Sequence, residues 1–101
     1  MKHELCKMAE VPTEGAKTVD FFGRQALVYR HGGEVRAALS VCVHLGGPLE
    51  LRGDQLVCPW HGARFDCGTG ACTHGPARAD AKAMLLPTRI EEGALYYVWG
   101  E

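Results

Sequence analysis

The chain has 101 residues, of which 47% are apolar and 23% are charged, and this is the composition of one ordinary globular domain. Its net charge of −1 at pH 7 excludes the basic surface that binds nucleic acid. Thirteen glycines in so short a chain indicate many tight turns, which are typical of a β protein.

The sequence also indicates the compartment. It has no run of about 18 apolar residues, so we expect no membrane-spanning helix. Residues 1–7 lack an apolar core and a twin arginine, so we expect no secretory signal and a cytoplasmic location. Cysteines in that reducing compartment favour metal binding over disulfides, and the five cysteines cannot all pair within one chain.

The first part of the chain predicts short β-strands separated by turn signals. These strands are expected at residues 4–9, 17–22, 25–30 and the first part of 34–43. The clearest turn signal is His31-Gly32-Gly33, which predicts a hairpin. The long 3.6-residue period of an amphipathic helix is absent, and residues 77–86 match it poorly.

The last part of the chain predicts a second hairpin. Residues 88–91 and 95–99 are strand-like and flank the turn signal Glu92-Gly93-Ala94. We therefore predict an all-β fold, in which antiparallel sheets form a small sandwich or barrel-like base. We expect a single domain over residues 1–101, with a glycine-rich site inserted between its early and late strands.

That middle part, residues 42–76, differs from the rest of the chain. It contains four of the five cysteines, three of the five histidines and seven of the thirteen glycines. Short apolar pieces at residues 55–57 and 63–65 stand between turns. Such a pattern indicates loops that are held by a site rather than by a core.

Two short motifs in this part each pair a thiol with an imidazole, namely Cys42-Val43-His44 and Cys58-Pro59-Trp60-His61. Two cysteines and two histidines can bind one tetrahedral zinc ion. They can also bind a [2Fe–2S] cluster, with two thiolates on one iron and two imidazoles on the other. The spacing favours the cluster, because zinc modules more often place two cysteines in one motif. A structural zinc-binding interaction module remains the alternative.

The chain resembles the Rieske proteins in three segments, CVHLGGPL, CPWHGARFD and TGACTHGPA. The likeness is greatest to the small Rieske ferredoxins of bacterial aromatic-ring dioxygenase systems, and similar chains occur as small subunits of nitrite reductases. The segments KHELCKMAEVPTEG and FFGRQALVYR extend the resemblance over nearly the whole chain. A cluster-binding subdomain is then expected near residues 40–77.

The resemblance implies that Cys42 and Cys58 ligate the buried iron, and that His44 and His61 ligate the outer one. It implies a soluble one-electron carrier that passes electrons from an NAD(P)H-dependent flavoprotein reductase to a terminal oxygenase and turns over no substrate itself. A nitrite-reductase-like small subunit is the alternative. The segment between the motifs is shorter than in most members, and we expect residues 52–54 to form a polar turn there.

The resemblance also bears on the reduction potential. Ala63 and Phe65 stand where high-potential members have hydroxyl donors to cluster sulfur, and Gly47 and Trp60 stand where those members have a disulfide. Because hydrogen bonds to sulfur raise the potential, we expect a value near the lower end of the Rieske range, about −150 mV.

The remaining candidate residues receive simpler interpretations. We expect an apolar docking rim around the cluster, formed by Leu45, Pro48, Trp60 and Pro76. Among the other thiols and imidazoles, we expect Cys6 in the core, Cys67 and Cys72 as turn-side thiols without a disulfide, and His3, His31 and His74 at the surface.

Overall fold

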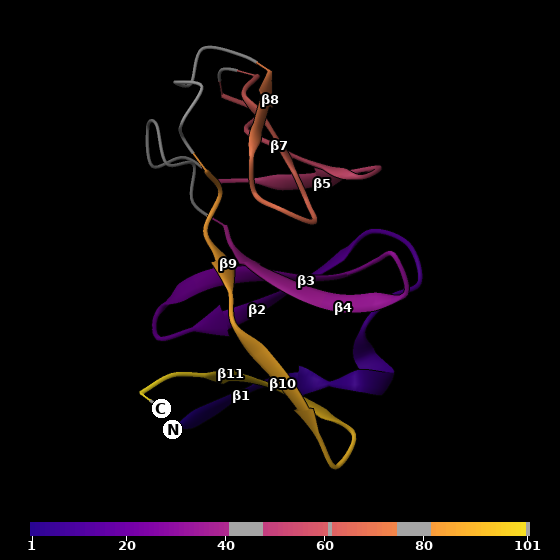
Figure 1. Ribbon diagram of the computed structural model, residues 1–101, viewed down its shortest axis with the longest axis vertical. Coiled ribbons are helices and arrows are strands. Elements are labelled where there is room, and N and C mark those ends of the chain that lie inside the picture. The colour runs from indigo at the N-terminus through magenta and orange to yellow at the C-terminus, as the bar shows by residue number, and fades with distance from the viewer. Residues whose placement is uncertain (41–47, 61, 75–81, 101) are drawn as a thin grey trace.

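The computed structural model describes residues 1–40, 48–60, 62–74 and 82–100, and its strands form three tiers (Figure 1). The lower and middle tiers contain β1 (Lys2–Lys7), η1 (Met8–Glu10), β2 (Ala16–Phe21), β3 (Arg24–His31), β4 (Glu34–Leu39), β9 (Leu85–Leu86), β10 (Thr88–Glu91) and β11 (Ala94–Val98). The upper tier contains β5 (Glu50–Arg52), β6 (Gln55–Val57), β7 (Arg64–Asp66) and β8 (Cys72–His74).

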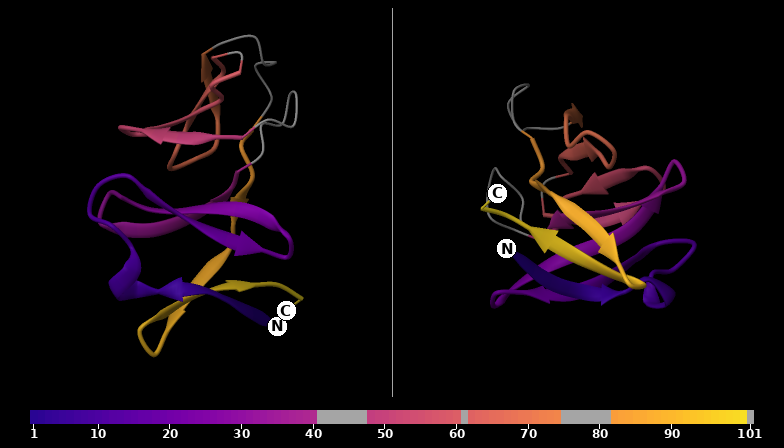
Figure 2. Two further views of the ribbon diagram at one scale, coloured as in Figure 1. Left: turned by 180° about the vertical axis from the view of Figure 1, so that it is seen from behind. Right: turned by 60° about the horizontal axis from the view of Figure 1, so that its bottom comes forward.

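Two antiparallel sheets form the base of the molecule. One sheet has the strand order β1-β11-β10 and the other has the order β2-β3-β4-β9. Apolar side chains of both sheets meet in one core cluster, which includes Leu5, Val19, Val28, Leu86 and Leu95. Figure 2 shows the two sheets stacked from behind and from below. The predicted all-β sandwich is therefore confirmed.

The two predicted hairpins are confirmed as well. Gly32 and Gly33 join β3 to β4 with φ values of 60° and 82°, the positive values that a two-residue hairpin turn requires. Glu92 and Gly93 join β10 to β11 with φ values of 48° and 78°. Ala94, predicted as part of this turn, is the first residue of β11.

The upper tier is a sheet with the order β5-β6-β7-β8. Its strands have only three residues each, and the predicted polar turn at residues 52–54 joins β5 to β6. Leu56 and Phe65 are fully buried in a second core cluster that also contains Leu27 and Tyr29 of the base. The upper sheet thus packs on the face of β3 that points away from the first cluster.

Residues 77–86, which match a helical period poorly, are not helical at the positions that the structure describes. Residues 75–81 lie outside the described ranges, and Leu85–Leu86 form β9, which pairs with β4. None of the described segments is a helix long and apolar enough to cross a membrane.

Candidate metal centre

Cys58 lies at the end of β6, at the start of a tight loop that leads into β7. Its amide donates to the carbonyl of Ala63 (2.9 Å), and its carbonyl accepts from the amide of Gly62 (2.8 Å). Gly62 has a φ of 79°, which a residue with a side chain rarely adopts. The Cys58 side chain is fully buried, so the loop fixes this thiol inside the upper tier.

The other three predicted ligands, Cys42, His44 and His61, lie outside the described residues. The structure therefore places one of the four. It also places the two ends of the segment that contains Cys42 and His44. The Ser40 hydroxyl donates to the Leu49 carbonyl and accepts from the Leu49 amide, both at 3.2 Å. Leu49 belongs to the same core cluster as Cys58, so the described chain after this segment packs beside the second motif.

These residues fit a [2Fe–2S] cluster in their chemistry. A buried cysteine at the start of a glycine-containing loop is the kind of thiolate donor that such a cluster uses. The chain adds a second thiol and two imidazoles in the paired motifs. Ala63 and Phe65, the positions without hydroxyls, are both fully buried behind the loop.

The exposed side of the loop is apolar. Trp60 is 66% exposed, and Pro48 is exposed as well. Both belong to the predicted docking rim, whereas Leu45 and Pro76 lie outside the described residues. Trp60 stands next to His61 in the sequence, so its ring is available to a partner that approaches this loop.

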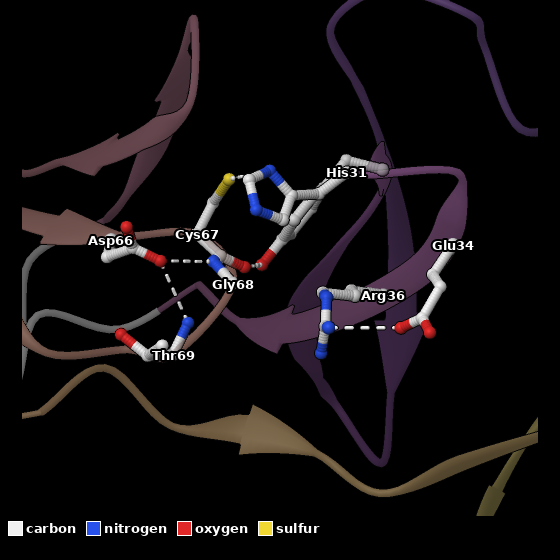
Figure 3. A network of polar contacts seen from close by, with 8 residues as sticks. His31, Glu34, Arg36, Asp66, Cys67, Gly68 and Thr69 are labelled. Atoms are coloured by element: carbon white, nitrogen blue, oxygen red, sulfur yellow. Dashed lines mark hydrogen bonds and ion pairs between the residues drawn. The ribbon is translucent and has the colours of Figure 1, made fainter.

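Sequence reasoning missed a junction between the two regions, which is centred on Cys67 (Figure 3). The buried Tyr29 hydroxyl donates to the Cys67 carbonyl at 2.6 Å. Cys67 Sγ lies 3.2 Å from His31 Nδ1, and the Cys67 amide donates to the Asp54 carbonyl at 3.1 Å. The surface position expected for His31 is therefore wrong, because its half-buried ring contacts the upper tier.

The ionisation of this junction follows from burial and hydrogen bonds. Burial raises the pKa of the Cys67 thiol and, much more, the pKa of the Tyr29 phenol. Both groups therefore keep their protons at neutral pH and can act as donors. The amides of Gly68 and Thr69 donate to Asp66 Oδ1 at 2.7 and 2.9 Å and lower the pKa of that carboxyl.

One signal in the sequence points to the junction. Tyr29 and His31 are two residues apart in a strand, so they share a face, and a buried Tyr29 brings His31 toward the same neighbour. Gly68 permits this contact, because a Cβ there would lie 2.7 Å from His31 Nε2.

The predictions for the remaining thiols and imidazoles are confirmed only in part. Cys6 is buried in the core cluster of the base. Cys67 and Cys72 are free, although Cys67 is a core residue rather than a turn-side thiol. His74 is exposed as expected, whereas His3 is half-buried. Within the described ranges, no group of three or more His, Cys, Asp or Glu side chains is arranged to hold a metal ion.

Comparison with protein families gives one match, to the Rieske [2Fe-2S] domain over residues 1–88. The oxygenase component of dicamba O-demethylase from Stenotrophomonas maltophilia is 37% identical over 81 residues, which are 73% of this chain and 24% of that protein. The ferredoxin component of the naphthalene 1,2-dioxygenase system of Pseudomonas aeruginosa is 29% identical over 85 residues, which are 81% of this chain and 80% of that protein.

Solved structures confirm the fold. The Sphingomonas yanoikuyae B1 ferredoxin has a TM-score of 0.82 and 27% identity, and the match covers 99% of this chain and 100% of that chain. A complex of reduced oxygenase and oxidized ferredoxin in carbazole 1,9a-dioxygenase has a TM-score of 0.76 and 23% identity over 95% of this chain and 91% of that chain. By contrast, the chain spans only 17–48% of the length of the first four curated relatives.

Proposed function

Because the chain belongs to the family of Rieske [2Fe–2S] domains, we propose that it binds one such cluster through Cys42, His44, Cys58 and His61 and carries single electrons between two proteins. When bound, the cluster accepts and releases one electron at a time. The observation that carries the proposal is the fully buried thiol of Cys58 in the tight loop that leads to Gly62. The buried position suits a ligand of the inner iron.

The second motif thus has two sides with different roles. Cys58 points into the core, while Trp60 is exposed on the outside of the same loop. We infer that His61, which follows Trp60, ligates the outer iron close to the surface. The cluster-binding subdomain of this single domain then covers about residues 40–77, and β5 to β8 form its framework.

The proposed partners are an NAD(P)H-dependent flavoprotein reductase and a terminal oxygenase, both in the cytoplasm. Similarity to ferredoxin components over most of their length supports this role. The proposed docking surface is the apolar rim of Leu45, Pro48, Trp60 and Pro76 around the two imidazoles. Interfaces of electron carriers are small and often bury less than about 1,200 Å² in total. A few apolar side chains can therefore form most of such a docking surface.

A low reduction potential suits this role, because the carrier must give its electron to the next protein. The fully buried Phe65 has no hydroxyl to donate to a cluster sulfur. One such hydrogen bond, if it favours the reduced state about tenfold, raises a one-electron potential by about 60 mV. We expect Phe65→Tyr to raise the reduction potential measured by voltammetry. An unchanged potential would show that the missing hydroxyl at Phe65 does not keep the potential low.

The decisive experiment is purification followed by visible absorption and electron paramagnetic resonance spectroscopy. We expect coloured protein that contains iron and acid-labile sulfide, bleaches on reduction and shows mixed thiolate and imidazole ligation. His44→Cys should retain iron but change the resonance spectrum. Colourless protein that contains zinc and no iron, even after anaerobic reconstitution, would contradict the proposal.

A second candidate function is that of the Rieske part of an oxygenase. The observation in its favour is the 37% identity to oxygenase components, of which the match covers about a quarter. A rapid-mixing experiment separates the two functions. A carrier, reduced and mixed with a separate Rieske oxygenase, is reoxidised by that protein, whereas the part of an oxygenase exchanges electrons only within its own assembly.

A further inference from the structure

A groove with a partly apolar lining lies in the base, between β10 and the edge of β4. The groove has a volume of about 560 Å³, within the size range of ligand sites. Its apolar lining comes mainly from Met8, Val35, Ala37, Leu86, Ile90 and Leu95. In Figure 1, the strands β4 and β10 that border the groove lie below the upper tier, which contains the loop between β6 and β7.

Backbone groups of β4 point into this groove. The Ser40 amide donates to Gln25 in β3, and the Leu39 amide donates to Met84 on the opposite side. Because backbone groups alternate along a strand, the N–H and C=O of Val35 point in the same direction as those of Leu39. Strand β9 pairs with β4 only at Ala37 and Ala38, so β9 does not cover Val35.

Strand β10 presents the other wall of the groove. It is the edge strand of its sheet, and Pro87, just before it, turns its carbonyl toward the amide of Val98 in β11. By the same alternation, the N–H and C=O groups of Thr88 and Ile90 point away from β11, and both residues line the groove. No backbone hydrogen bond joins these two edges across the groove in the part of the chain that the structure describes.

The inner face of the groove also carries a positive charge. Arg30 is paired with Val35 across β3 and β4, so the two side chains share a face. Arg30 forms no ion pair with any described residue, although it also borders a smaller hollow that contains Glu14. Arg36, Arg89 and Glu34 line the groove as well, but Arg36 is paired with Glu34 and Arg89 with Glu91, so among the described residues Arg30 is the cation that remains for a ligand.

We propose that this groove binds an extended acidic segment of a partner protein, which adds a strand between β4 and β10. The open edges supply backbone hydrogen bonds, and pockets for alternate side chains supply specificity. The apolar part of the lining and the exposed Ile90 contact apolar side chains of the segment, and Arg30 forms an ion pair with one of its carboxylates. A partner held here leaves the loop of Cys58 and Trp60 free, so the site tethers the protein without blocking electron exchange.

The test uses the cluster-containing protein and two labelled eight-residue peptides. One peptide alternates glutamate with valine and threonine, and the other has lysine in place of glutamate. Fluorescence anisotropy measures binding, and amide hydrogen exchange locates it. We expect the acidic peptide to bind at least about tenfold more tightly than the lysine peptide and to slow exchange at the amides of Val35, Thr88 and Ile90.

Single substitutions identify the groups responsible. Arg30→Glu and Ile90→Lys should each weaken binding of the acidic peptide by at least about tenfold. Arg24→Glu makes the same charge change at the other end of β3 and serves as the matched control, with binding unchanged. The visible spectrum should stay the same in all three variants, which separates this proposal from the ligand assignment.

Four results would overturn the proposal. The first is no binding of the acidic peptide at concentrations up to about 1 mM, and the second is equal binding of both peptides. The third is slowed exchange of the same amides with inorganic phosphate alone and with neither peptide, which would indicate a small-anion site. Slowed exchange that depends on protein concentration without peptide would indicate that a second copy of the chain occupies the groove.

Discussion

The base and the upper tier are both built from antiparallel strands, but different forces hold them. In the base, β1, β2 and β4 have six residues each and β3 has eight, and two sheets enclose a core of their own. In the upper tier each strand has three residues, and the core is completed by side chains from β3 and β4.

The difference shows how a small protein supports a metal centre. Four strands of three residues bury too little apolar surface for independent stability. We therefore expect the upper tier to depend on the base, through the Cys67 junction, and on the cluster that its loops are proposed to hold. Metal binding is coupled to folding in such regions, so the two regions should respond differently to the same perturbation.

The largest effect is expected from loss of the cluster. Chelation of iron, or Cys58→Ser, should abolish the protection of the β6 and β7 amides from hydrogen exchange and leave that of β2 and β3 largely intact. Cys6→Ser, a thiol substitution in the core of the base, is the matched control and should retain the cluster. Equal loss of protection in both regions after chelation would show that they unfold as one unit.

Truncation of a core side chain comes next. Phe65→Ala removes the largest fully buried side chain that the upper tier itself contributes and should lower the free energy of unfolding by about 3–5 kcal/mol. The loss should appear as faster exchange in β6 and β7 only. Leu95→Ala, in the base core, should lower the free energy of unfolding by about 2–5 kcal/mol and speed amide hydrogen exchange in both regions. The reverse pattern would refute the dependence of the upper tier on the base.

The junction gives a smaller effect. Tyr29→Phe leaves the buried Cys67 carbonyl without its 2.6 Å donor and should lower the free energy of unfolding by about 1–3 kcal/mol. Urea denaturation followed at the visible band of the cluster measures this change. Tyr96→Phe, which removes a hydroxyl at the surface of the base, is the control and should have little effect.

The smallest effect is expected at the surface of the base. Lys2 donates to Glu91 at 2.8 Å and lowers the pKa of that carboxyl. A lowered pKa stabilises the fold above the ordinary pKa of a carboxyl, and this contribution is lost as the pH falls through the lowered value. Glu91→Gln should therefore reduce Tm slightly at pH 7 and not at all at pH 2. Glu14→Gln is the control, and equal shifts in both variants would exclude the ion pair as the cause.

Local signals explain what the sequence predicted about the fold. The turn signals at Gly32-Gly33 and Glu92-Gly93, each between strand-like neighbours, located the two hairpins, because few residues other than glycine readily adopt the positive φ values of two-residue turns. The three-residue strand β5 had no such signal, since its pairing depends on β6 rather than on its own residues. The pattern of residues 77–86, which matches a helix poorly, did not indicate β9 either, because β9 is defined by contact with β4.

By itself, the sequence determined the strand pattern of the base, the family and the kind of metal site, because these depend on residue type and on spacing along the chain. Only the tertiary structure decided that His31 contacts Cys67, and that the open edges of β4 and β10 face one groove. Contacts of this kind join residues that are far apart in the sequence. They depend on how the sheets twist and stack, and the residues of a short segment do not determine that geometry.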